Sequence, residues 1–256
     1  MRDAGAGSLD EIEAYYDTVP RAAATTEEVG PFTLFLAEEG IGWQFYARPR
    51  LGGGDAFTTD DVRRVLARQD ELGVPRAIEW VDQVTPSLLP AVSASGQEAG
   101  RYPLLALPHD TEVRAPERTR ALAADDADLG LVVGAVHAAF DEAGEVAARP
   151  VGRRPELIAD GRLIEVAAYD TDGRLVGGGS AAPRGETAEL MGIGVPPAYR
   201  TAGVGTAITQ ALVGACRAAG VRTVFLSAGN DAAASIYRRI GFEDIGTACI
   251  LGSPDE

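Results

Sequence analysis

The chain has 256 residues, enough for one large domain or two smaller ones with a buried core. Its formal net charge of −15 argues against a nucleic-acid ligand and an anionic membrane surface, and favours a small cationic substrate. All 23 basic residues are arginine, which excludes mechanisms that need a Schiff-base lysine or a phosphate-binding lysine.

Cysteine usage and hydropathy suggest the compartment. Cys216 and Cys249 lie in no metal-ligand or redox spacing, so we expect two buried thiols, no disulfide and no metal. No apolar run approaches the roughly 20 residues of a membrane span, and the first residues lack the features of a signal peptide. These observations predict a soluble cytoplasmic protein.

The first half alternates helical and extended patterns. The helix predicted over 57–74 begins at a Thr59 cap and ends at Gly73. The proline-flanked run 108–117 is the predicted domain boundary. In chain order, helices are expected near 9–16, 57–74 and 85–96, and extended runs at 32–37, 43–47, 77–81 and 102–107, with the glycine turn "RLGGGD" after the second run.

The second half reads as an antiparallel meander that enters an α/β unit. Asp172 and Gly173 form a hairpin turn signal between two strands. The pattern predicts an α+β domain with a mixed sheet. Helices are expected near 126–142, 154–159, 205–219 and 230–241, and strands near 163–169, 174–182, 187–195, 223–228 and 246–251.

The segment "VPPAYRTAGVGTAITQAL" runs from a predicted strand into a predicted helix through an RxxGxG pattern of Arg200, Gly203 and Gly205. A nucleotide P-loop is excluded because the chain has no lysine. A dinucleotide fingerprint is disfavoured because Ile208 stands where its third glycine belongs. A helix N-terminus that binds a pyrophosphate, such as that of coenzyme A, remains.

From about Glu112 to Leu251 the chain resembles a GCN5-related N-acetyltransferase of the GNAT superfamily. Three motifs carry the resemblance in the family's order. "ELMGIGV" resembles its fourth strand, "RTAGVG" its acetyl-CoA loop, and "NDAAASIYRRIGF" the helix that carries a family tyrosine. The resemblance implies a central mixed, largely antiparallel sheet flanked by helices, with acetyl-CoA as acyl donor and no metal.

The resemblance also implies the residues that bind the coenzyme. Loop amides would hold the pyrophosphate, and the fourth strand would pair with the pantetheine amides. Asn230 is predicted to cap the next helix, and by resemblance it contacts the cofactor, although capping alone would explain it. The loop residues are Arg200, Thr201, Ala202, Gly203, Val204, Gly205 and Thr206, and the strand residues are Ile193, Gly194 and Val195.

Two side chains are candidates for catalysis. By resemblance, the Tyr237 hydroxyl faces the sulfur of acetyl-CoA. Since tyrosine has a pKa near 10 and a thiol near 8.5, we expect a hydrogen bond to the departing thiolate rather than full proton transfer. Glu189 is expected to share a strand face with Met191, Ile193 and Val195, and it is a candidate general base. The alternative is that its carboxylate is simply exposed to solvent at the end of the strand.

The order of elements after "RLGGGD" repeats the order after "RTAGVG", which indicates an internal repeat. In the first copy Val92 takes the place of Tyr237, and Asp55 takes the place of the second motif glycine. A plain glycine loop is the alternative interpretation. We expect a degenerate GNAT-like domain at 1–108, which binds no acetyl-CoA and shapes the acceptor site or a partner surface, and a catalytic domain at 109–256.

The predicted activity is transfer of an acetyl group from acetyl-CoA to an amine of an unidentified small molecule or peptide by direct attack. The alternatives are a mycothiol-synthase-like tandem acetyltransferase and a non-catalytic acyl-CoA-binding regulatory module. Expected partners are acetyl-CoA and the amine acceptor, without nucleic acid or membrane, and a homodimer is left open. His137 is expected to pack within an apolar helix, and His109 is assigned no role.

Overall fold

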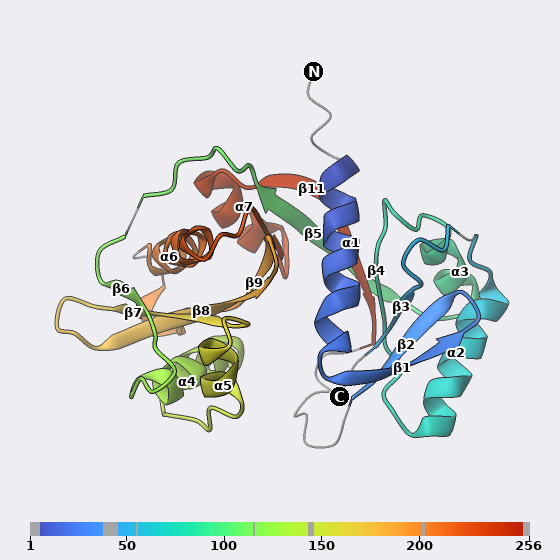
Figure 1. Cartoon of the computed structure of the whole chain (residues 1–256), viewed down its shortest axis with the longest axis horizontal. Helices are drawn as coiled ribbons and strands as arrows, with labels where there is room; N and C mark the ends of the chain where they lie inside the picture. Colours follow the sequence, from blue (N-terminus) through green and yellow to red (C-terminus); the bar gives the residue numbers. More distant parts are fainter. Residues whose placement is uncertain are drawn as a thin grey trace. The chain divides into compact units, whose positions relative to one another are not determined.

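The computed structural model describes residues 6–37, 46–54, 56–114, 116–142, 146–200 and 203–252 (Figure 1). These residues form seven α-helices and eleven strands, which confirms the predicted mixed α+β class. Contacts divide the chain into two compact units that are described separately. The first unit is Met1–Leu104 with Ile245–Glu256, and the second is Leu105–Asp244.

The first unit combines a small sheet with three helices. Neighbouring strands pair antiparallel, except that β3 and β4 run parallel. The strands follow the order β1 (Ala24–Val29), β2 (Phe32–Ala37), β3 (Ala47–Pro49), β4 (Ile78–Val81) and β11 (Glu243–Leu251). The helices are α1 (Ala6–Arg21), α2 (Thr59–Leu72) and α3 (Leu88–Ala94).

The core of the first unit forms where α2 packs on the strands. Val62, Val65 and Leu66 repeat on one face of α2 and are buried, as the amphipathic pattern predicts. The helix ends at Gly73 as expected, but it is capped by Thr58 and not by Thr59. The extended run expected at 43–47 lies mostly outside the described residues.

The second unit has a longer sheet with helices on both faces. In Figure 1, α6 covers one face and α4 and α5 the other. Its strands follow the end of β5 (Ala99–Leu107) in the order β10 (Thr223–Ser227), β9 (Thr187–Gly194), β8 (Leu175–Arg184), β7 (Ile164–Tyr169) and β6 (Thr119–Ala121). The helices are α4 (Leu129–Phe140), α5 (Arg154–Ala159), α6 (Val204–Ala218) and α7 (Asp231–Ile240), with a 3₁₀ turn at Pro197–Tyr199.

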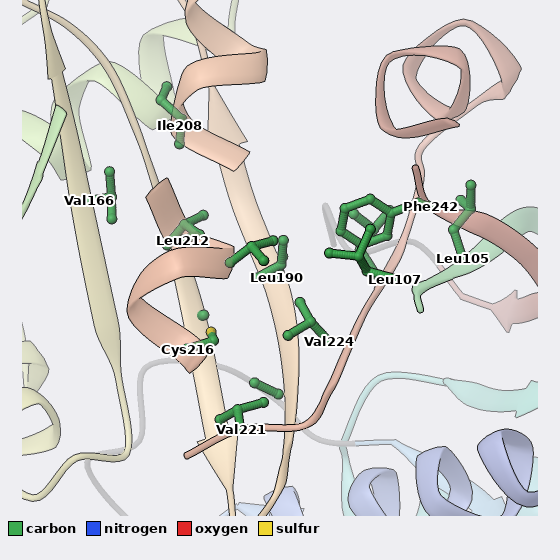
Figure 2. Packing of buried hydrophobic residues seen from close by; sticks show 14 of the residues in the cluster. Leu105, Leu107, Val166, Leu190, Ile208, Leu212, Cys216, Val221, Val224 and Phe242 are labelled. Carbon is green, nitrogen blue, oxygen red and sulfur yellow. The ribbon is translucent and has the colours of Figure 1, made fainter. Parts of the chain in front are cut away.

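The main core of the second unit lies beneath α6. Figure 2 shows Ile208, Leu212 and Cys216 of this helix beside Leu190 of β9. The predicted burial of the Cys216 thiol is confirmed, and burial raises its pKa to about 12. The other cysteine, Cys249, is also buried, in the core of the first unit.

The last strand of each half ends in the other unit. Leu105 and Leu107 of β5 belong to the core of the second unit (Figure 2). Conversely, β11 pairs with β4, and its Cys249 and Leu251 belong to the core of the first unit. The functional division at residue 108 stays a prediction, while the structural division falls within β5 and β11.

Leu105→Ala should therefore destabilise the second unit although it precedes the predicted domain boundary. Leu105 is fully buried, and a buried Leu→Ala change typically lowers the free energy of unfolding by about 2–5 kcal/mol. Urea unfolding measures this loss, and amide hydrogen exchange in α6 should accelerate. Leu72→Ala, at a position 36% exposed on α2, is the control; equal effects of the two changes would refute the assignment.

A buried ion cluster lies within the first unit. Arg48 Nη2 lies 3.2 Å from Glu13 Oε1, and Arg48 Nη1 lies 3.7 Å from Glu79 Oε2. The guanidinium also stacks over the ring of Tyr16, 4.4 Å from its centroid. One guanidinium balances only one of the two carboxylates, and burial raises the pKa of Glu79 to about 7.

Glu79 should make the first unit less stable as the pH rises. Its folded pKa lies above the unfolded value of about 4.5, so its stabilising protonation is complete below pH 4.5 and is lost as the pH rises through 7. The loss in unfolding free energy should be about 1–3 kcal/mol, because the side chain is 27% exposed and partly screened. Urea unfolding from pH 4.5 to 8 should show this slope in wild type and in the surface control Glu98→Gln. A slope that persists in Glu79→Gln would assign it to another group.

Candidate functional site

Strand β9 carries a bulge at Gly192. Its φ of +56° lies in the left-handed region that glycine adopts without strain, and the register of β8 against β9 shifts at this place. Leu190 and Ile193 consequently both pack on the core beneath α6. Met191, between them, lies on the opposite face and is 37% exposed.

Because of the bulge, Glu189 does not lie on the strand face that the sequence predicts. This residue and Met191 alternate with the buried Leu190, so they share the face opposite α6. Ile193 and Val195 pack against the core beneath α6 instead. The expectation that Glu189 shares a face with Ile193 and Val195 is therefore wrong, because the extra residue at the bulge inverts the alternation.

Strands β9 and β10 part after Glu189. They pair in parallel from Thr187 and Thr223 to Glu189 and Phe225, where the register ends. Strand β9 continues beyond this pair to Gly194. Glu189 therefore lies where the strands separate, and the predicted pantetheine-binding residues lie on the part of β9 beyond the last pair.

The start of α6 has the features of an anion-binding site. Gly203 is its N-cap, with φ +75° and no side-chain capping bond, and the first turn holds no acidic residue. A Cβ atom on Gly203 would meet nothing within 4 Å. The first amides, from Val204 to Thr206, carry the positive end of the helix dipole. Thr201 and Ala202 lie outside the described residues.

Arg200 anchors the loop to its surroundings. Its Nε donates to the Val195 carbonyl at 3.0 Å, and its Nη2 donates to the Ala139 carbonyl at 2.9 Å. Its Nη1 lies 3.7 Å from the Glu142 carboxylate. The guanidinium thus ties the loop to the end of β9 and to α4, and a direct contact with a cofactor stays a prediction.

Gly194 has a packing role that the sequence analysis missed. An ideal Cβ at this position would lie 2.8 Å from Val136 Cα and 3.1 Å from Ala139 Cβ. Only glycine therefore lets α4 approach β9 this closely. The Gly-Ile-Gly run was the available signal, but it did not say which helix would lie against the strand.

Helix α7 presents Tyr237 at the core of the second unit. The predicted cap is confirmed, since Asn230 Oδ1 accepts a hydrogen bond from the Ala233 N–H at 2.9 Å. The Tyr237 ring meets the edge of Phe242 with centroids 6.0 Å apart, and burial raises the pKa of its hydroxyl. The phenol is therefore a hydrogen-bond donor at neutral pH, and its approach to a sulfur atom stays a prediction.

The histidines take no part in this arrangement. His137 is exposed on α4, so the expectation that it packs within the helix is wrong. His109 Nδ1 lies 3.3 Å from the Arg222 carbonyl. The described residues contain no group of three His, Cys, Asp or Glu side chains that could hold a metal ion. None of the helices described is long and apolar enough to cross a membrane.

The corresponding parts of the first unit differ in chemistry. Val92, which the predicted repeat aligns with Tyr237, is fully buried in α3. Arg50 Nη1 lies 3.5 Å from a Glu28 carboxylate oxygen, where Arg200 binds backbone carbonyls. Asp55 lies outside the described residues.

Comparison with known proteins finds a family and several solved structures that this chain resembles. Residues 139–242 match the model of the acetyltransferase (GNAT) family, and no curated protein matches the sequence. A GCN5-related N-acetyltransferase from Kribbella flavida is 24% identical, with a TM-score of 0.72 over 97% of this chain and 96% of that chain. A functionally unknown conserved protein from Staphylococcus epidermidis is 18% identical, with a TM-score of 0.63 over 93% and 96%. A tandem GNAT protein from the clavulanic acid biosynthesis pathway is 15% identical, with a TM-score of 0.57 over 87% and 78%.

Alanine at the two motif glycines should have opposite effects on stability. Gly203→Ala should lower the unfolding free energy by about 1 kcal/mol, because φ is positive there. Gly205→Ala should raise it by up to about 1 kcal/mol, because this helical residue leaves its Cβ 3.8 Å from Val195 Cγ2, an ordinary contact. Urea unfolding of both variants measures the difference, and changes of equal sign would contradict this geometry.

Proposed function

We propose that this chain, whose residues 139–242 match the GNAT acetyltransferase family, moves an acetyl group from acetyl-CoA to the amine of a small molecule or peptide. One observation carries the proposal. The parted strands β9 and β10 belong to the same unit as the uncapped start of α6, and β9 leads through Arg200 into that helix. Beyond the last pair with β10, the backbone of β9 can pair with an extended ligand. The free amides at the start of α6 can bind an anion.

The residues present fit coenzyme A. The amides of Gly203, Val204, Gly205 and Thr206 would hold the pyrophosphate, and the open space at Gly203 would let it approach. Thr201 and Ala202 complete the loop in the proposal. The Val195 carbonyl already accepts a bond from Arg200, so Ile193 and Gly194 would supply most of the pairing with the pantetheine amides. Asn230 remains a proposed cofactor contact in addition to its cap.

The proposed chemistry is a direct attack. The amine nitrogen forms a bond to the thioester carbonyl, the carbon–sulfur bond breaks, and the thiolate leaves. Glu189 takes the amine's proton directly or through water, and the Tyr237 hydroxyl donates a hydrogen bond to the sulfur as it becomes anionic. Cys216 and Cys249 are buried thiols with raised pKa values, so neither is suited to carry the acetyl group.

The acceptor is proposed by class alone. The net charge of −15 attracts an amine that is cationic in solution. The chain is similar to a tandem GNAT protein, so a mycothiol-synthase-like tandem acetyltransferase stays an alternative. This alternative requires an amino-sugar acceptor. The non-catalytic module is the second alternative, and it requires acyl-CoA binding without turnover.

A screen of amines with acetyl-CoA tests the proposal. The library should contain polyamines, amino sugars, aminoglycosides and peptide N-termini, and thiol release should be followed with a chromogenic disulfide. The matched control is Gly203→Glu, whose carboxylate would occupy the pyrophosphate site and repel its charge. Thiol release that needs an amine and is lost in the control supports an enzyme. Tight acetyl-CoA binding without thiol release for any amine would support the regulatory module.

Tyr237→Phe should lower kcat by about 10-fold to 100-fold and leave acetyl-CoA affinity nearly unchanged. The ring and its packing on Phe242 are kept, and the lost hydrogen bond strengthens only in the transition state. The matched control is Tyr169→Phe, which removes a hydroxyl that donates to Asp128 at 2.6 Å and should leave kcat unchanged. Rates must be measured at saturating acceptor with the chemical step limiting. Equal kcat in Tyr237→Phe and wild type would leave Tyr237 a packing residue.

A further inference from the structure

A cavity of about 630 Å³ lies entirely within the first unit. This volume is typical of sites that bind small organic molecules. Asp10 and Glu13 of α1 form one wall, and Arg50 and Leu51, at the start of the turn after β3, form another. That turn, "RLGGGD", takes the place in the first repeat that "RTAGVG" takes in the second. The cavity therefore occupies the position where the second repeat is proposed to bind a pyrophosphate.

The helix after this turn does not suit an anion. Thr58 Oγ1 accepts a hydrogen bond from the Asp61 N–H, and Asp61 Oδ2 accepts one from the Thr58 N–H at 3.0 Å. The capping box therefore occupies amides at the start of α2, whereas the start of α6 has no side-chain cap. Asp60 and Asp61 also place two carboxylates in the first turn of α2. A phosphate here would meet engaged donors and negative charge.

The charges on the cavity wall favour a cation. Asp10 is exposed on α1, and Glu13, one turn further along, is 7% exposed. Arg48 Nη2 lies 3.2 Å from Glu13 Oε1, and its Nη1 lies 3.7 Å from Glu79 Oε2, so one guanidinium faces two carboxyl groups. Arg50, a cation that lines the cavity, has its Nη1 3.5 Å from Glu28 Oε2. A ligand cation beside Asp10 and Glu13 would gain attraction in a partly desolvated position.

Apolar side chains complete the cavity. Leu51 and Val84 are 48% and 41% exposed, which is high for large hydrophobic residues, and both line it. Phe57 is buried at the wall, with its ring centroid 4.8 Å from that of Phe32. A ligand with an apolar body would remove Leu51 and Val84 from water, which is favourable in proportion to the area covered.

We propose that this cavity binds a small organic cation, namely a protonated amine carried on an apolar body. The ammonium group would lie beside Asp10 and Glu13, and the apolar body against Leu51, Phe57 and Val84. This site is distinct from the coenzyme site proposed in the second unit. The repeated turn would thus serve an anion in one unit and a cation in the other.

The test uses the full chain and three probes of similar shape and different charge. 2-Phenylethylammonium, 2-phenylethanol and phenylacetate are titrated by calorimetry, with cyclohexylammonium and hexylammonium as further amines. At least one ammonium should bind with a Kd of about 1 mM or tighter, and at least 10-fold tighter than the alcohol or the acid. Amide hydrogen exchange should slow in residues 50–57 and 84–87. Failure of all three amines to bind at about 10 mM, or a preference for phenylacetate, overturns the proposal.

Variants separate this cavity from an amine site elsewhere. Asp10→Asn should weaken ammonium binding about 10-fold, while Glu11→Gln, the matched change at the next position of α1, should not. Ala56→Trp should block the cavity, because Ala56 is exposed and lines it. Gly203→Glu should keep ammonium binding, so that loss of the coenzyme site and loss of this site are distinguished. Ammonium binding that survives both Asp10→Asn and Ala56→Trp would refute the assignment.

Discussion

The left-handed backbone at Gly192 is the constraint on which the arrangement of the second unit depends. One extra residue at this point turns β9 so that Leu190 and Ile193 both face α6. Glu189 is left on the opposite face, at the last residue paired with β10. Beyond the bulge the strand leads into the turn where Arg200 reaches back to the Val195 carbonyl. The same short part of β9 thus lies where the strands separate, carries the Glu189 carboxylate and leads to the loop that Arg200 anchors.

The two segments of the predicted repeat have the same order of elements but different side chains at the helix start. Each has a turn after a strand, a helix that follows it, and a further strand beside that helix. Helix α6 starts without a side-chain cap, whereas Thr58 and Asp61 form a capping box at the start of α2. Capping stabilises a helix by about 1 kcal/mol, but it also uses the donors that would bind a ligand anion. Stability and ligand binding compete for the same amides.

The features that were predicted from the sequence depend on short-range chemistry. Gly73 ends α2, Asn230 caps α7, and the apolar face of α6 is buried, because each requires only neighbours within a turn or two. The bulge was missed because residues 189–195 alternate like a regular strand, and the partners of Arg200 come from distant parts of the chain. Strands β1 and β6 were also missed. They lie at the two ends of the strand order, where polar residues and short length weaken the periodic signal.

The path of the last strand bears on the synthesis of the protein. Cys249 and Leu251 fill the core of the first unit, yet they are synthesised only after strands β5 to β10. Until the second unit has been synthesised, β4 therefore lacks this antiparallel partner and presents an edge that other chains could join. A chain that lacked β11 would therefore have its defect in the first unit, although β11 follows the second unit in the sequence. Each unit is thus completed by a strand from the other half of the sequence.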